Sequence, residues 1–145
     1  MQITDTEKLN CPVCGKQSLH TDVRSVAFRY KGHSITIAQS GFRCDSCRES
    51  VLEGKNLAKM RLAIQTFRSK IDGLMLPEEI QHVRKKILGL TQQEASALFG
   101  GGPNAFSRYE RGAVPPPRAL SNLLKILAKH PEQINELNVN RMQKA

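Results

Sequence analysis

The four cysteines are the residues of this sequence best suited to chemistry, because they occur as two identically spaced pairs. The pairs are CPVC, with Cys11 and Cys14, and CDSC, with Cys44 and Cys47. A Cys-x-x-Cys spacing lets two thiolates reach one ion from a single tight turn. Four thiolates at about 2.3 Å complete a tetrahedral shell around zinc, with no open position for water or substrate. We therefore expect one structural Zn²⁺ per chain.

A redox pair and a pair of disulfides are the competing interpretations of these cysteines. A thioredoxin-like site needs one Cys-x-x-Cys motif beside a β-α-β pattern, whereas this chain has two such motifs. Disulfides belong to oxidising compartments, and residues 1–10 contain no apolar stretch resembling a signal peptide. No run approaches the roughly 18 apolar residues of a membrane span. The sequence thus predicts a cytoplasmic protein with reduced thiols and no membrane contact.

A second stretch, LFGGGPNAFSRYERG at residues 98–112, is typical of a segment that binds nucleic acid. Asn104, Arg108 and Arg111 recur at intervals of four and three, which places them on one face of a helix. In the major groove of DNA, asparagine can form two hydrogen bonds with adenine, and arginine can do so with guanine. We expect Asn104 and Arg108 to read bases.

Further polar residues are expected to contact phosphates and to set the register of the protein on the duplex. These residues are Ser107, Arg111, Gln92 and Gln93. Lys85 and Lys86 are equally compatible with phosphate contacts and with a solvated helix face. The alternative interpretation of the whole polar face is the solvated surface of a helical connector, which the flanking turn and cap disfavour.

The elements around this stretch have the proportions of a helix-turn-helix. TQQEASALF opens with a Thr-x-x-Glu capping box and predicts the first helix. Gly100 to Gly102 then allow a sharp turn through positive φ, Pro103 pre-sets the first turn of the second helix, and Gly112 caps that helix at its end. Within the second helix, Phe106 and Tyr109 are expected to pack inward.

Helical periodicity continues on both sides of this motif. In PEEIQHVRKKILG, Ile80, Val83 and Ile87 are expected to point inward. The leucines between Leu120 and Leu127 are compatible with a dimer interface as well as with domain core. A single such module buries only a modest area on DNA, so we expect a homodimer on a palindromic operator in double-stranded DNA. Residues 138–145 are expected to fray.

The segment between the cysteine pairs predicts a β-hairpin, because VAFRY and ITI alternate apolar and polar residues around the turn KGHS. A helix over about residues 53–70 follows, and its apolar stripe is expected to close the zinc module. The predicted fold class is α+β. We expect a small Cys₄ zinc-binding domain with a β-hairpin and a helix over residues 1–71, a linker over 72–76, and an all-α helix-turn-helix domain for DNA binding and dimerisation over 77–145.

The charge and the absence of catalytic patterns restrict the class of function. The chain carries 22 Lys and Arg against 13 Asp and Glu, a formal charge of +9, which favours a polyanionic partner. The sequence shows no Ser/His/Asp set, no paired carboxylates and no phosphate-binding loop, and a closed Cys₄ site offers zinc no substrate position. We do not expect an enzyme.

Together the motifs resemble a known family. LTQQEASALFGGGPNAFSRYERG is similar to the Cro/repressor-type (XRE-like) helix-turn-helix, and FGGGPNAFSRYERG with CPVCG and CDSCRES resembles the MqsA-type zinc-finger antitoxins over about residues 11–137. The resemblance implies a two-domain dimer whose zinc domain binds and neutralises an RNA-cleaving toxin. It also implies that the second domain represses its own operon at a palindromic operator. By the same resemblance, the four cysteines are the zinc ligands and Asn104 and Arg108 contact bases.

Some features depart from the family pattern, namely the longer segment before Cys11, Pro103 in the glycine turn, the VPPP loop and the C-terminal tail. None of them removes an expected ligand or base reader. The toxin-binding surface has no short motif, so no residues are predicted for it. The alternative hypothesis is a stand-alone zinc-containing transcriptional regulator, whose operator affinity would change with its metal or thiol state.

Overall fold

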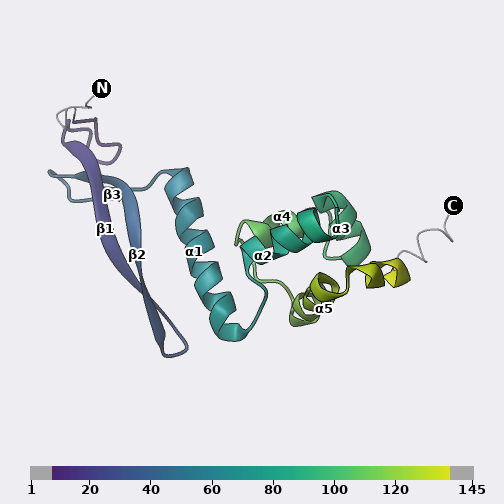
Figure 1. Ribbon diagram of the computed structural model, residues 1–145. Coiled ribbons are helices and arrows are strands. Elements are labelled where there is room, and N and C mark those ends of the chain that lie inside the picture. The colour runs from purple at the N-terminus through teal and green to yellow at the C-terminus, as the bar shows by residue number, and fades with distance from the viewer. Residues whose placement is uncertain (1–7, 138–145) are drawn as a thin grey trace, which may run out of the picture. The chain divides into compact units, whose positions relative to one another are not determined.

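A computed structural model of the chain describes residues 8–137. The fold is α+β, as the sequence predicted, with a three-stranded antiparallel sheet followed by helices (Figure 1). The chain divides into two compact units, and the boundary between them in the sequence lies between Met60 and Arg61. The predicted fraying of residues 138–145 lies outside the described range.

A long hairpin forms most of the first unit. Strands β1 (Leu19–Tyr30) and β2 (His33–Cys44) are antiparallel and pair continuously, from Leu19 opposite Cys44 to Tyr30 opposite His33. The short strand β3 (Ser50–Val51) pairs with the other side of β2, so the strand order is β1-β2-β3. The predicted hairpin is therefore confirmed, and β1 lies at one edge of the sheet.

The hairpin turn consists of two residues, Lys31 and Gly32, with φ of 47° and 79°. Two-residue turns with positive φ match the right-handed twist of the strands that they join. The sequence indicated KGHS as the turn, whereas His33 already belongs to β2. This two-residue turn, shorter than the predicted four-residue turn, sets the register of β1 and β2.

Helix α1 (Gly54–Asp72) confirms the predicted helix, but its buried side differs from the expected apolar stripe. The buried residues of α1 are Gln65 and Ser69, which are joined by a hydrogen bond of 3.1 Å from Gln65 Nε2 to Ser69 Oγ. Leu57, a member of the predicted stripe, is 37% exposed. Moreover, the helix from Arg61 onward belongs to the second unit, so the stripe does not serve the zinc module alone.

Gly112 explains why the second half of α1 packs within the second unit. A Cβ added at this glycine would lie 3.0 Å from Leu62 Cα and 3.2 Å from Gln65 Cβ. The backbone at Gly112 also has φ of 73°, as the predicted helix cap requires. A residue with a side chain would push α1 away and would strain the turn.

The second unit is helical and is arranged around one core. Its elements are α2 (Pro77–His82), the π-helical η1 (Val83–Ile87), α3 (Gln92–Phe99), α4 (Ala105–Glu110), α5 (Arg118–Lys129) and the 3₁₀ turn η2 (Pro131–Gln133). Ile80, Ala95, Phe106 and Leu124 are completely buried at its centre. The ring of Phe106 lies 5.6 Å from that of Tyr109, edge to face, which is a favourable arrangement for aromatic pairs.

The leucine-rich helix α5 contributes to this core. Leu120, Leu124 and Leu127 are buried, whereas Ile126 is 55% exposed. Most of the leucines that were compatible with a dimer interface are therefore core residues of their own unit. None of the described helices is both long and apolar enough to span a membrane.

A candidate metal centre and a candidate nucleic-acid interface

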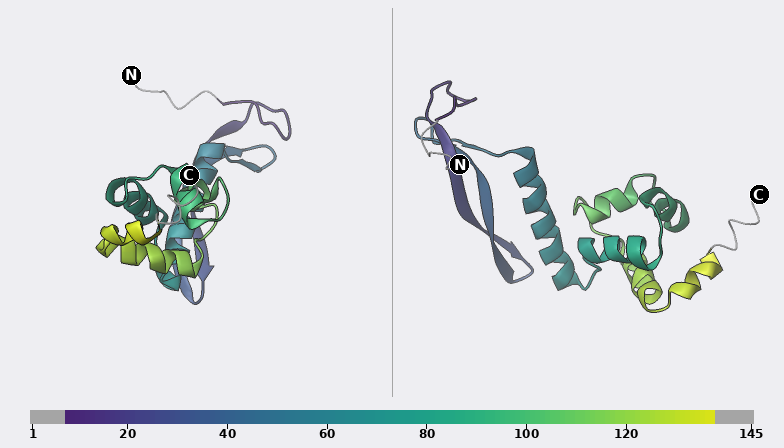
Figure 2. Two further views of the ribbon diagram at one scale, coloured as in Figure 1. Left: turned by 90° about the vertical axis from the view of Figure 1, so that its right-hand side faces the viewer. Right: turned by 45° about the horizontal axis from the view of Figure 1, so that its top comes forward.

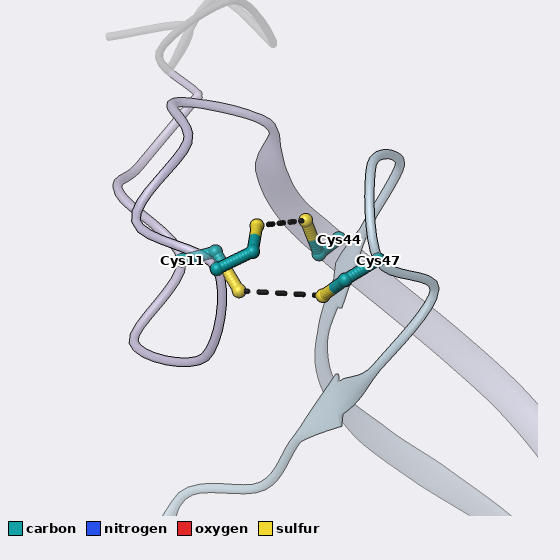
Figure 3. Close-up of side chains that lie close together, drawn as sticks. Cys11, Cys44 and Cys47 are labelled. Atoms are coloured by element: carbon teal, nitrogen blue, oxygen red, sulfur yellow. Dashed lines mark hydrogen bonds between the residues drawn. The ribbon is translucent and has the colours of Figure 1, made fainter.

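The structure brings the four cysteine sulfurs together (Figure 3). Cys11 Sγ lies 3.7 Å from Cys47 Sγ, Cys14 Sγ lies 3.6 Å from Cys44 Sγ, and all four atoms are within 4.8 Å of one another. A tetrahedron with metal–sulfur bonds of about 2.3 Å has edges of about 3.8 Å. The four sulfurs are thus placed to hold one metal ion, and no second cluster of this kind occurs in residues 8–137.

The two cysteine turns have the same backbone construction. The N–H of Gly15 donates to Cys11 O, and the N–H of Arg48 donates to Cys44 O, both at 2.9 Å. The donor residue has positive φ in each turn, 76° at Gly15 and 62° at Arg48. Left-handed backbone costs an L-residue roughly 1–2 kcal/mol, and the hydrogen bond from Arg48 N to Cys44 O helps to hold this turn.

Cys44 occupies the most protected position of the cluster, because β2 ends at this residue and the residue is 0% exposed. The backbone N–H of Cys47 and the hydroxyl of Ser18, 3.1 Å from Cys44 Sγ, lower the pKa of this thiol to about 6 against the opposing effect of burial. The thiolate is the form that binds metals. The N–H of Glu49 lowers the pKa of Cys47, but burial and the neighbouring cysteine sulfurs together raise it to about 12. A bound cation would attract all four thiolates, and so would offset the repulsion between neighbouring sulfurs that raises the pKa of Cys47.

Gly41 allows the second cysteine turn to approach the hairpin. A Cβ at this position would lie 2.7 Å from Val51 O and 2.8 Å from Leu52 Cδ2. The Leu52 side chain could rotate away, but Val51 O belongs to the backbone, so a side chain at position 41 would require the backbone to move. Gly41 therefore positions β3 against β2, and with it the segment that carries Cys47.

In the second unit, α4 separates the expected base readers from the aromatic residues of the core. Asn104, Arg108 and Arg111 are exposed, whereas Phe106 and Tyr109 are buried, as predicted. Arg108 Nη2 donates to Gly101 O at 3.3 Å, and Arg111 Nε donates to Ser107 O at 3.2 Å. Both guanidinium groups are thus held over the surface of α4 and its preceding turn.

The glycine turn before α4 has the predicted positive φ, at 87°, 96° and 93° for Gly100, Gly101 and Gly102. At Gly101 an added Cβ would lie 2.9 Å from Ala105 Cβ and 3.1 Å from Tyr109 Oη. This glycine is therefore needed for space as well as for φ. Pro103 lies outside the helix rather than in its first turn, because Asn104 is the N-cap and α4 begins at Ala105.

Helix α3 presents the two glutamines differently. The predicted capping box is confirmed, since Glu94 N donates to Thr91 Oγ1 and Thr91 N donates to Glu94 Oε2, both at 3.1 Å. Gln93 is exposed, whereas Gln92 is half-buried and donates from Nε2 to Glu110 Oε2 at 2.8 Å. Ser107 is also half-buried.

Comparison with known proteins identifies the family of the chain. The family model described as "Antitoxin component of bacterial toxin-antitoxin system, MqsA" matches residues 9–138, and so covers the described parts of both units. The chain belongs to the MqsA antitoxin family. It is also 37% identical over 131 residues to Antitoxin MqsA of Escherichia coli (strain K12), which covers 89% of this chain and 99% of that protein. As a member of the MqsA family, the chain is an antitoxin of a toxin–antitoxin system.

This MqsA-family chain also contains a buried ion pair that was missed from the sequence. Arg84 Nη2 lies 2.7 Å from Glu110 Oε1, and the two side chains are only 8% and 5% exposed. Arg84 Nη1 also donates to Leu90 O at 2.7 Å, while Glu110 Oε2 accepts from Gln92. The network joins η1, α3 and the end of α4. The sequence contains one indication that Arg84 is buried. Arg84 follows Ile80 by four residues and therefore lies on the same helix face as this buried residue.

Proposed function

We propose that this antitoxin neutralises an RNA-cleaving toxin through its first unit and represses its own operon through its second unit. In this proposal the chain acts as a cytoplasmic homodimer on a palindromic operator and is not an enzyme. The observation that carries the proposal is the family match over residues 9–138, because it covers the cysteine cluster and the glycine turn with α4 in one antitoxin family.

The metal in this proposal is one structural Zn²⁺ per chain, bound by the four cysteines. The all-thiolate ligand set supports it, since soft sulfur ligands at tetrahedral positions favour zinc or iron–sulfur clusters over hard cations. The four sulfurs fit a single ion. Bound zinc would tie both cysteine turns to the end of the hairpin, and it would supply no reaction.

The DNA-binding part of the proposal rests on the exposed face of α4. Asn104 and Arg108 are the proposed base readers, and their exposed side chains lie on the side of α4 opposite the buried Phe106. The proposed phosphate contacts are Arg111, Ser107, Gln92 and Gln93. Gln92 gives one amide hydrogen to Glu110, which leaves its second for a phosphate oxygen.

Replacement of Arg108 by alanine should weaken binding to the operator by about 1–3 kcal/mol per half-site, because a two-fold contact with guanine is lost. Binding to random DNA should change much less. Titration of labelled operator and of a scrambled duplex at one salt concentration measures both. Arg61→Ala, which removes an exposed arginine of α1, is the matched charge control. An equal loss on both duplexes would make Arg108 a phosphate contact instead.

The toxin part of the proposal predicts a stoichiometric complex with the toxin that is expressed from the same operon. Native mass spectrometry should show this complex with zinc bound, and RNA cleavage by the toxin should stop when the antitoxin is equimolar. A zinc-loaded homodimer that leaves the toxin active and unbound would favour the stand-alone regulator instead.

A further inference from the structure

The outer edge of β1 exposes a long row of backbone groups. At its start, Leu19 exchanges two hydrogen bonds with Leu9, at 2.8 and 3.0 Å, on the side of β1 away from β2. In an antiparallel pair, the backbone groups of alternate residues point to opposite sides of the strand. Every second residue after Leu19 therefore directs its N–H and C=O outward as well. These residues are Thr21, Val23, Ser25, Ala27 and Arg29.

No backbone partner for these outward groups occurs among residues 8–137. The pairing of β1 is with β2 alone, apart from the single bridge between Leu9 and Leu19. Figure 1 and the right-hand view of Figure 2 show β1 as the outermost strand of the first unit. We call this row, from Thr21 to Arg29, the free edge.

The free edge has neither a proline nor a bulge, which are two of the devices by which proteins prevent unwanted strand pairing, and its charged outward residue, Arg29, lies at its far end. The β1–β2 register runs through all twelve pairs without a bulge, and β1 contains no proline. The side chains of Thr21, Val23, Ser25 and Ala27 are exposed, small and uncharged, and Val23 is 68% exposed. An edge with small, uncharged side chains at four successive outward positions and with no bulge or proline is suited to accept another strand.

We propose that the toxin binds at the free edge by adding an antiparallel strand to β1. This inference rests on the proposed function, because it names the surface through which the first unit would meet its toxin. Strand addition gives affinity through main-chain hydrogen bonds and specificity through alternate side chains. The antiparallel bridge of Leu9 shows that the same edge already accepts backbone pairing from outside the hairpin.

Charge identifies the toxin rather than a second copy of this chain as the occupant. Residues 8–60 carry nine Lys and Arg and four Asp and Glu, a formal charge of +5, which becomes +3 when four thiolates hold the proposed Zn²⁺. Two copies paired edge to edge would bring two such charges together, which opposes association. The occupant that complements the free edge is an uncharged strand of the toxin with an acidic residue near Arg29 and Lys31, where β1 ends.

Ser25→Pro tests the proposal, because it removes one outward N–H at the middle of the free edge. Proline is tolerated at an edge position whose N–H does not serve the sheet. Ala38→Pro is the matched control, since Ala38 lies directly opposite Ser25 and its N–H points to the other edge of the same hairpin. Ser25→Ala controls for the side chain. Zinc content and circular dichroism establish that each full-length variant is folded.

With the purified toxin of the same operon as probe, Ser25→Pro should weaken binding at least about tenfold, because the toxin's carbonyl group is left unpaired. Both controls should bind as the unmodified chain does. Hydrogen exchange on the unmodified complex gives a second measurement that needs no variant. The amides of Val23, Ser25 and Ala27 should become protected when toxin binds.

The outcomes separate this inference from the proposed function. If toxin binds the unmodified chain but these amides stay unprotected, or if folded Ser25→Pro binds equally well, the free edge is not the toxin site. If no toxin binds to the unmodified chain, the proposed function itself is wrong. If the amides are already protected in the free dimer and stay so at all concentrations, the occupant is a second copy and the toxin assignment is overturned.

Discussion

Replacement of Glu110 by alanine is expected to lower the free energy of unfolding of the second unit by about 3–5 kcal/mol, because it leaves Arg84 charged and unpaired in the interior. Arg84 is 7% exposed as a whole residue, and the lost carboxylate also releases Gln92 from its hydrogen bond. Such a loss is a large part of the 5–15 kcal/mol that is usual for a domain. The effect should exceed that of any single surface substitution.

Urea unfolding followed by far-UV circular dichroism measures this change. Glu132→Ala is the matched control, since Glu132 is a 66% exposed acid in a loose 3.8 Å pair with His130, and its replacement should change stability by less than about 0.5 kcal/mol. The double variant Arg84→Met with Glu110→Leu should recover much of the loss, because no buried charge is left unpaired. A Glu110→Ala protein as stable as its control would show that the network carries little energy.

Removal of the metal is expected to unfold the first unit and to leave the second unit folded. Two of the four cysteines, Cys11 and Cys44, are buried with Leu19 in the small core cluster of the first unit, and Cys47, Phe42 and Val51 pack against them. In such small cores the free energy of metal binding is also folding free energy. Cys44→Ser should have the same effect as a chelator, because a hydroxyl in place of this sulfur breaks the tetrahedral set.

Hydrogen exchange resolved by segment measures this result, because it reports on each unit separately. Amides of β1 and β2 should lose protection at room temperature, whereas those of α4 and α5 should keep it. Ser46→Ala, an exposed position inside the second cysteine turn, is the control and should retain the metal. If chelation instead leaves the sheet protected and changes operator affinity, the zinc site is a sensor and the stand-alone regulator becomes the better explanation.

Most of the features that could be predicted from the sequence are formed by residues that lie close together along the chain. The cysteine pairs, the capping box of α3 and the glycines before α4 each involve residues a few positions apart, and the structure contains all three. Their geometry depends on backbone turns whose residue preferences are strong. The roles of Asn104 and Arg108 in DNA binding stay predictions, although the structure exposes both side chains.

Contacts between distant segments could not be predicted in this way. The partner of Arg84 is Glu110, which lies in a different helix, and VRKK has the composition of a solvated basic surface. The π-helical turn at Val83–Ile87 and the contact of α1 with Gly112 likewise depend on tertiary packing. The division of the chain into compact units within α1 has the same origin. The linker at residues 72–76 and the division of functions between the domains stay predictions.

The cysteines lie at the open end of a hairpin without bulges, so a bound metal ion would favour one alignment of the two strands. Leu19 and Cys44 face each other at that end, and the two-residue turn closes the other. A slip by one residue would move Cys44 by about 3.3 Å and turn its sulfur to the opposite face of the sheet. Such a hairpin could not assemble four thiolates. A metal ion bound by the four cysteines would therefore stabilise only the correctly aligned hairpin.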